Sequence, residues 1–253
     1  AQRRAGRMKE DFWVKKLISM LMCGMMVGSM AFAAPMEDDR SYLPEGEEVN
    51  GDLSYEEGGQ YYVPTPEEEA MNELIASMPE LHSDSYYKVV SVTPFLQENS
   101  YYCGPATVKQ TINAINGSSE SQSAYASKLG TTTSGTDMTR IAPVLNAAQS
   151  KKQYVYRNFS DMNFWLSYGK WALNAGVPAV LDINTTNVPA FPYRTTGHFI
   201  NLSGLNMDSN DGSGTTNQAL VTDPFGPGFG NKWYYVTNVY QANRNHTRSA
   251  IIS

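Results

Sequence analysis

The sequence contains few cysteines and few histidines. Among its 253 residues are 2 cysteines and 3 histidines. Cys23 lies in an N-terminal apolar run that we expect to be removed, which would leave Cys103 as the one cysteine of the mature chain. A lone cysteine excludes an intramolecular disulfide, and scattered histidines offer no cluster of zinc ligands. We therefore expect no disulfide framework, no metal site and no cofactor.

Long apolar runs are missing beyond residue 40. None there approaches the ~20 residues that a membrane helix needs. The apolar run at 17–32 follows two lysines, and a small-x-small triplet typical of signal cleavage covers 31–33. Residues 1–33 are therefore predicted to be a signal peptide. We expect the mature protein to be secreted and extracellular, with no stable membrane insertion after the signal is removed.

Positive charge is nearly absent from residues 37–84. This stretch has 15 acidic residues and one basic residue, Arg40, so its net charge is −14. Residues 86–253 have 12 basic and 8 acidic residues, a net charge of +4. We expect residues 34–85 to form an acidic, largely disordered pro-segment or linker that precedes a single domain at 86–253. The basic residues of that domain are scattered, which argues against nucleic-acid binding.

One short helix is expected inside the acidic segment. Thr65 is a suitable N-cap, and Pro66 suits the first helical position. Four apolar residues recur at helical spacing on one face: Met71, Leu74, Ile75 and Met78. Two interpretations remain open. The segment is either a solvated spacer or a pro-segment whose helix packs on the body as an intramolecular partner.

The domain places its helices before most of its strands. Helical patterns cover residues 105–115, 119–129, 136–148 and 160–174, the last with Ser160 as its expected N-cap. Short β-branched or aromatic runs follow at 178–183, 198–204, 219–222, 233–236 and 250–252. Shorter strands are expected at 87–92 and 153–157, and a short helix at 238–242. This order predicts an α+β domain with a helical lobe followed by an antiparallel sheet.

Cys103 stands directly before a Gly-Pro pair that opens a helix. Free backbone N–H groups and the positive end of the helix dipole favour the thiolate at such a position. The thiolate is the nucleophilic form, so the context indicates a reactive cysteine. The alternative is a buried cysteine that packs as a small apolar residue.

Three further residues are candidate partners of a cysteine nucleophile. His198 begins an apolar strand, where its ring could act as a base or pack as a core histidine. Asp223 ends a strand and could accept the Nδ1–H of His198, or serve as an ordinary turn residue. Gln97, six residues before Cys103, could donate to an oxyanion or lie on the surface. His246 has polar neighbours that indicate a solvated turn.

In chain order these elements resemble a known family. Gln, five residues, and then Cys-Gly-Pro-Ala occupy 97–106, followed by Gly-His at 197–198 and Asp-Pro at 223–224. The pattern is similar to the papain-like cysteine peptidases, above all to the branch of bacteriocin-leader-processing peptidase domains. The resemblance covers roughly residues 89–253. It implies a two-lobed papain-like fold, a helical lobe followed by an antiparallel sheet lobe.

The resemblance also implies a role for each candidate residue. Cys103 would be the nucleophile, His198 the general base, Asp223 the orienter of the ring, and Gln97 the oxyanion donor. The expected function is a secreted cysteine peptidase that cleaves a peptide or protein substrate through an acyl-thioenzyme. Enzymes of this branch are usually fused to a membrane transporter, and the export signal expected here departs from that pattern, so the substrate stays open.

Two alternatives to peptide hydrolysis are retained. The same scaffold could perform other acyl chemistry, namely amide or peptidoglycan-peptide hydrolysis or transpeptidation. A catalytically silent domain used for binding is the alternative from a different class. Such a domain would tend to lose at least one of the four candidate residues, and this chain has all four.

Overall fold

The computed structural model describes residues 65–78, 85–207 and 217–253. Every described residue belongs to one compact unit, Asp39–Ser253. The predicted signal peptide at 1–33 and most of the predicted acidic segment at 34–85 lie outside the described residues. The division of the chain at these two boundaries stays a prediction.

The described elements follow the predicted order of helices and strands. The helices are α2 (Pro66–Ala76), α3 (Cys103–Asn116), α4 (Gln122–Leu129), a 3-10 turn (Met138–Arg140), α5 (Ile141–Ala148), α6 (Met162–Asn174) and α7 (Val236–Asn245). The strands are β1 (Tyr86–Val89), β2 (Tyr156–Asn158), β3 (Ala179–Ile183), β4 (His198–Met207), β5 (Gln218–Asp223), β6 (Gly230–Tyr235) and β7 (Ala250–Ile252).

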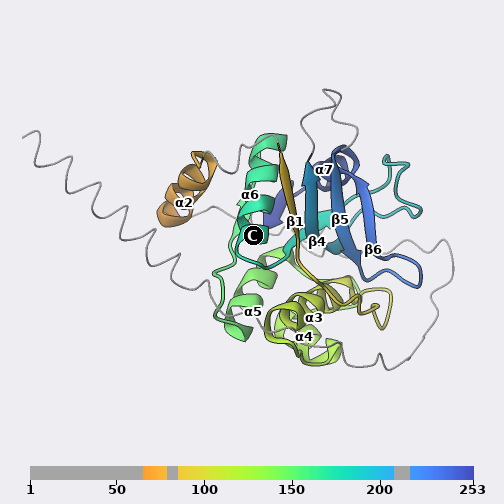
Figure 1. Cartoon of the computed structure of the whole chain (residues 1–253). Helices are drawn as coiled ribbons and strands as arrows, with labels where there is room; N and C mark the ends of the chain where they lie inside the picture. Colours follow the sequence, from red (N-terminus) through yellow and green to blue (C-terminus); the bar gives the residue numbers. More distant parts are fainter. Residues whose placement is uncertain (1–64, 79–84, 208–216) are drawn as a thin grey trace, which may run out of the picture. The chain divides into compact units, whose positions relative to one another are not determined.

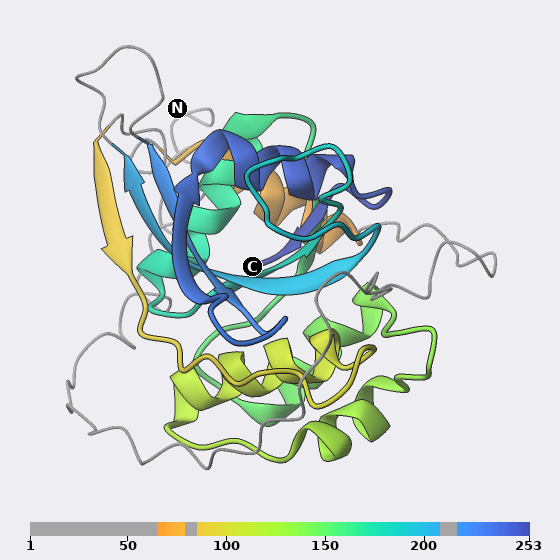
Figure 2. The ribbon, with the colours of Figure 1, turned by 90° about the vertical axis from the view of Figure 1, so that its right-hand side faces the viewer.

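The strands form one antiparallel sheet in the order β2-β7-β3-β4-β5-β6, and β1 pairs with the second half of β4. Figures 1 and 2 show α3, α4 and α5 gathered on one side, with the sheet, α6 and α7 on the other. The predicted α+β class is therefore confirmed. Its two halves meet where α3 packs against β4.

Polar contacts join the cysteine helix to the central strand. Thr107 Oγ1 donates to the carbonyl of Phe199 over 2.9 Å, and Thr111 Oγ1 lies 2.8 Å from Asn201 Oδ1. All four residues are fully buried. Because buried polar groups are costly without partners, these bonds set the position of α3 along β4.

Helix α6 packs on the sheet through a small residue. A Cβ at Gly169 would lie 2.9 Å from Leu202 Cδ2, so a larger residue there would force the Leu202 side chain or the helix to shift. The N-cap of α6 is Asp161, whose carboxylate accepts from the N–H groups of Asn163 and Phe164. The expectation of Ser160 as the cap was wrong by one residue; the Ser160 hydroxyl instead donates to the other oxygen of the Asp161 carboxylate over 3.1 Å.

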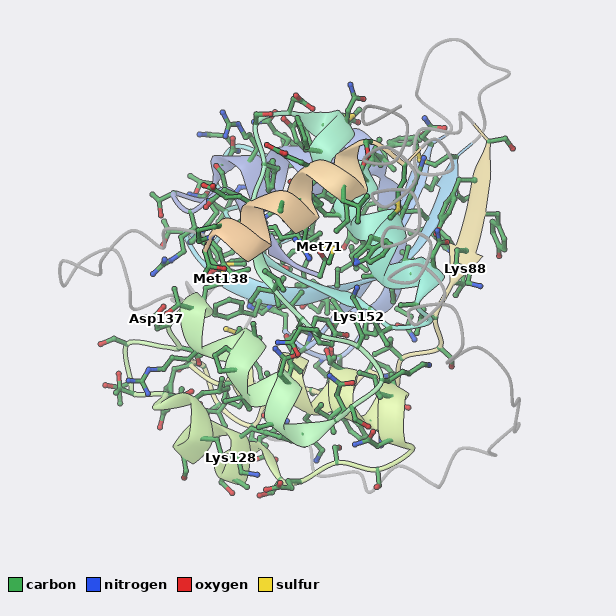
Figure 3. All side chains as sticks on the ribbon, turned by 90° about the vertical axis from the view of Figure 1, so that its left-hand side faces the viewer. Met71, Lys88, Lys128, Asp137, Met138 and Lys152 are labelled. Atoms are coloured by element: carbon green, nitrogen blue, oxygen red, sulfur yellow. The ribbon has the colours of Figure 1, made fainter. Side chains whose placement is uncertain are left out.

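Helix α2 confirms the amphipathic helix expected near the end of the acidic segment. Ile75 is fully buried in the core, and Met71 and Met78 pack against that core. The helix contacts α6, and Asn72 Oδ1 accepts from the guanidinium of the buried Arg157. Figure 3 shows α2 and the labelled Met71 from the side of the domain on which α2 lies. This helix thus packs on the body and is not solvated on all sides.

Candidate active site

Cys103 is the first residue of α3 and is fully buried. The preceding residue, Tyr102, gives the helix no side-chain cap, and only its backbone carbonyl accepts from the first turn, from the N–H of Ala106 over 2.9 Å. The next residue, Gly104, leaves no room for a larger side chain, because a Cβ there would lie 2.8 Å from the Cβ of Thr136. The absence of this side chain lets the loop that carries Thr136 close over the start of the helix. The thiol therefore sits in a tightly packed, uncapped helix terminus.

His198 and Asp223 form a buried pair. His198 Nε2 lies 2.9 Å from Asp223 Oδ1, and the side chains of both residues are almost completely shielded from solvent. The expectation that the carboxylate accepts from Nδ1 was wrong. Asp223 ends the neighbouring strand β5, and Nε2, the ring nitrogen farther from the backbone, is the one that reaches it. Nε2 is thus occupied, so the nitrogen open to a thiol is Nδ1.

The carboxylate of Asp223 is held by two further donors. The backbone N–H of Phe225 donates to Oδ1 over 2.8 Å, and the hydroxyl of Tyr193 donates to Oδ2 over 2.7 Å. Tyr193 also stacks on Phe225, with ring centroids 4.3 Å apart and the rings nearly parallel. Asp223 is therefore more than a turn residue, because its bonds orient it toward His198.

Sequence reasoning missed Tyr193. It lies in the loop between β3 and β4, where only Phe191 and Tyr193 are aromatic among polar residues and prolines. Both side chains are buried, and this pair of aromatic residues in a polar loop was the signal available. The contact with Asp223 spans 30 positions in the chain, so no local pattern shows it.

Opposing effects act on the His198 ring. Burial alone lowers its pKa, but the Asp223 carboxylate and then the Cys103 thiol raise the pKa from 6.5 to about 10. Nδ1 is a buried atom without a hydrogen-bond partner among the described residues. The rings of Tyr193 and Phe225 approach edge-on, with centroids 5.5 and 5.8 Å away. The aromatic surroundings exclude water, which strengthens the attraction between the ring and the carboxylate.

Gln97 is buried, so it is no surface glutamine. Its backbone N–H donates to the carbonyl of Pro224 over 2.8 Å, which ties it to the turn that follows Asp223. Its side-chain Nε2 donates to the carbonyl of Asn99 over 2.9 Å, within the loop that leads to Cys103. A primary amide has two N–H groups, so one bond to Asn99 leaves a second donor.

His246 does not lie in a solvated turn, as its polar neighbours had indicated. It is buried, and its Nε2 lies 3.6 Å from Asp182 Oδ2. The buried Asn243, near the end of α7, donates to the backbone carbonyl of Asp182 over 2.7 Å. This bond draws the turn after α7 against β3, which is why a polar segment becomes buried there.

The described residues show neither a cluster of metal ligands nor a membrane-spanning helix. In residues 65–78, 85–207 and 217–253, no group of three or more His, Cys, Asp and Glu side chains is arranged to hold a metal ion. Over the same ranges, no helix has the length and apolar character required to cross a membrane.

Comparison with known proteins identifies the family. Residues 89–248 match the model of the Peptidase C39 like family. Two solved structures are similar: a double-glycine-motif protease from an AMS/PCAT transporter in complex with the leader peptide, and the peptidase domain of Streptococcus ComA, a bifunctional ABC transporter of a quorum-sensing pathway. The first is 11% identical, covers 65% of this chain and 92% of its own, and has a TM-score of 0.43. The second is 16% identical, covers 66% of this chain and 96% of its own, and has a TM-score of 0.38.

No curated protein sequence matches this chain. The family match does not depend on the two solved structures, and it spans more than half of the sequence, including all four candidate residues. The chain therefore belongs to the Peptidase C39 like family and is a cysteine-type peptidase.

Proposed function

We propose that this protein is a secreted cysteine peptidase that cleaves peptide bonds with Cys103, His198 and Asp223 as its triad. The observation that carries the proposal is the buried His198–Asp223 pair, with Nε2 and Oδ1 2.9 Å apart. The pKa of His198, raised to about 10 by Asp223 and Cys103 against burial, means that the ring holds a proton at neutral pH. In the resting enzyme that proton comes from Cys103, so the pair consists of thiolate and imidazolium.

Cleavage follows in two steps. The Cys103 sulfur attacks the carbonyl carbon of the scissile bond, and the oxyanion accepts hydrogen bonds from Gln97 Nε2 and the Cys103 backbone N–H. The C–N bond breaks as His198 Nδ1 gives its proton to the leaving amine. Water then attacks the thioester while Nδ1 takes a proton from it, and the acid departs as the thiolate re-forms.

Access to the sulfur is part of this proposal. The Cys103 side chain is fully buried, so a substrate carbonyl reaches it only when neighbouring side chains move. Tyr101 and Tyr102 precede the cysteine, and their rings meet edge to face with centroids 5.2 Å apart.

Secretion is proposed from the sequence alone. The lysines, apolar run and small-x-small triplet within residues 1–33 support an export signal. Expression with a C-terminal tag, followed by N-terminal sequencing of the protein in the medium, tests it. The expected first residue is Ala34 or one close to it. Protein that stays in the cells with residues 1–33 intact would refute secretion.

Labelling of the purified chain by an iodoacetamide-type electrophile tests the mechanism. An ordinary thiol titrates near ~8.5, so labelling of Cys103 that persists below about pH 6.5 indicates the thiolate–imidazolium pair. His198→Ala should abolish this low-pH labelling. When the full chain, which still carries Cys23, is labelled, Cys23→Ser is the matched control and should leave the labelling of Cys103 unchanged. A labelling midpoint near 8.5 that His198→Ala does not alter would refute the mechanism and favour a silent binding domain.

The reaction product then separates peptide hydrolysis from the other acyl chemistries. A mixed peptide library is incubated with the active chain, in water and with an added primary amine, and the products are identified by mass. Peptide hydrolysis predicts fragments with free carboxyl termini in both conditions. The masses of the two fragments should add up to the mass of the peptide plus one water. Products that carry the added amine would instead indicate transpeptidation.

A further inference from the structure

A second buried carboxylate acts on the backbone of the same histidine. Asp182, on β3, is fully buried, and its Oδ1 accepts a hydrogen bond from the backbone N–H of His198 over 3.0 Å. His198 is the first residue of β4, where the chain changes from loop to strand. Burying a carboxylate is costly unless hydrogen bonds or an opposite charge compensate it. The two carboxylates therefore hold His198 from different sides, Asp223 at the ring and Asp182 at the main chain.

The other oxygen of Asp182 faces His246. The distance from Oδ2 to His246 Nε2 is 3.6 Å, and both side chains are almost fully buried. His246 Nδ1 accepts from the backbone N–H of Arg248 over 3.4 Å. A neutral His246 must therefore carry its proton on Nε2, the nitrogen that points toward Asp182. His246 thus presents a hydrogen to the carboxylate in either protonation state.

The backbone of Asp182 is also fixed by a side-chain hydrogen bond. Asn243 Nδ2 donates to the Asp182 carbonyl over 2.7 Å and to the Ala250 carbonyl over 2.9 Å. Asn243 Oδ1 in turn accepts from Trp165 Nε1 over 2.9 Å. Side chains from α6 and α7 thereby fix the strand residue that anchors His198.

We infer that Asp182 and His246 are positioning residues for His198. This inference rests on the proposed function, in which the ring must lie between Cys103 and Asp223. The direction of a side chain follows from its backbone, and a strand's first residue has fewer ladder bonds to hold it. Asp182 supplies the missing restraint, and His246 keeps the Asp182 carboxylate aimed at the His198 N–H.

Matched pairs of variants of the full chain test the inference. Asp182→Asn keeps an oxygen that accepts the His198 N–H, while Asp182→Ala removes it. His246→Gln keeps a donor toward Asp182, while His246→Leu removes it. For each variant kcat, KM, the Cys103 alkylation rate, its pH profile and the melting temperature are measured. The alkylation rate and its pH profile can be measured without knowing the substrate.

A positioning role predicts a specific pattern. Asp182→Ala should lower kcat and the low-pH alkylation rate by about 10²-fold, the cost of displacing a reacting group by about 1 Å, with KM changed little. Asp182→Asn should stay within about threefold of wild type. The alkylation midpoint should not shift in Asp182→Asn, because Asp182 acts by holding the backbone and not by its charge. His246→Leu should lower kcat and the alkylation rate more than His246→Gln does, and both effects should be smaller than that of Asp182→Ala.

Several outcomes would overturn the inference. Wild-type kcat and alkylation in both Asp182→Ala and His246→Leu exclude a positioning role, as do equal losses in Asp182→Asn and Asp182→Ala. If Asp182→Ala does not fold, the His246 pair decides the question by the same comparison. A wild-type chain with neither peptide turnover nor His198-dependent alkylation refutes the proposed function, and the inference falls with it. An active wild type with unaffected variants refutes the inference alone.

Discussion

The backbone N–H of Gln97 donates to the carbonyl oxygen of Pro224 over 2.8 Å. Pro224 directly follows Asp223, and Gln97 lies in the loop between β1 and α3 that leads to Cys103. One main-chain bond therefore joins the segment before the cysteine helix to the end of β5. Asn231 Nδ2 adds a parallel link by donating to the carbonyl of Val92 over 3.0 Å. These bonds hold the two segments of the candidate site in register.

Replacing Gln97 should affect turnover more than binding. If its second amide hydrogen meets the oxyanion, Gln97→Ala should lower kcat by roughly 10²-fold with KM nearly unchanged, since the bond forms only in the transition state. Gln110→Ala is the matched control, because Gln110 is also buried and donates to the carbonyl of Phe95. That variant should lose stability and keep its kcat per folded molecule. Equal kcat in Gln97→Ala and wild type would remove Gln97 from the mechanism.

Tyr193→Phe should weaken the orientation of Asp223. The change leaves Asp223 Oδ2 buried without its phenolic donor, which costs about 1–3 kcal/mol, and it preserves the stacking on Phe225. We expect a lower free energy of unfolding by urea denaturation and a reduced kcat, because the carboxylate gains freedom to turn away from His198. Tyr234→Phe, another buried tyrosine, should leave kcat unchanged. A Tyr193→Phe enzyme with wild-type kcat and stability would contradict this role.

The His198–Asp223 pair predicts a dependence of stability on pH. Despite burial, which lowers it, the folded pKa of His198 is raised by Asp223 and Cys103 from 6.5 to about 10. A raised pKa stabilises the folded state fully below pH 6.5, and this contribution disappears as pH rises to about 10. Urea denaturation at pH 8, 9 and 10 should show the stability gap between wild type and His198→Gln shrinking with pH.

The comparison with His198→Gln isolates the ring together with the proton that it takes from Cys103. An ordinary thiol in the unfolded chain keeps that proton up to about pH 8.5, so the gap is compared above pH 8. Lys152, whose pKa is lowered to about 7 by burial and by Arg157, also titrates in this range, but it is present in both proteins and cancels in the difference. A gap that is constant or widens between pH 8 and 10 would show that His198 is not protonated in the folded enzyme.

Helix α2 should stabilise the body through one buried side chain. Ile75 is fully buried, so Ile75→Ala should lower the free energy of unfolding by about 2–5 kcal/mol, through lost burial and a residual cavity. Leu74→Ala, at a partly exposed neighbour, should cost less. Thermal and urea unfolding measure both changes. If both substitutions are neutral, the docking of α2 contributes nothing to stability.

Removal of the acidic segment together with α2 tests whether this segment regulates the domain. The acidic segment has a net charge of −14 over residues 37–84, and the domain has a net charge of +4 over 86–253. These opposite charges favour attraction between the two, which salt screens over ~8–10 Å. The contacts of α2 involve α6 and Arg157, so we expect residues 34–253 and 85–253 to differ in stability. Cys103 labelling and turnover at low and high salt report inhibition. Equal rates per folded molecule at every salt concentration would leave α2 a structural role only.

The sequence alone determined most elements and their order, because helices and strands begin and end on local signals. The Gly-Pro pair after Cys103 predicts a helix from residue 105, and α3 is found there, beginning two residues earlier at Cys103. Gly117 and Gly130 end α3 and α4 with the left-handed backbone expected of C-cap glycines. The four residues of the candidate site were also named from sequence, by their type, order and neighbours.

Contacts between distant segments were decided by the tertiary structure alone. Which nitrogen of His198 meets Asp223 depends on the offset between β4 and β5, and the Tyr193 contact depends on how one loop folds back. The polar sequence neighbours of His246 predict a solvated residue, yet the structure buries it against Asp182. Local chemistry specifies where an element starts, but only packing across the whole chain brings a given side chain within hydrogen-bonding distance of another.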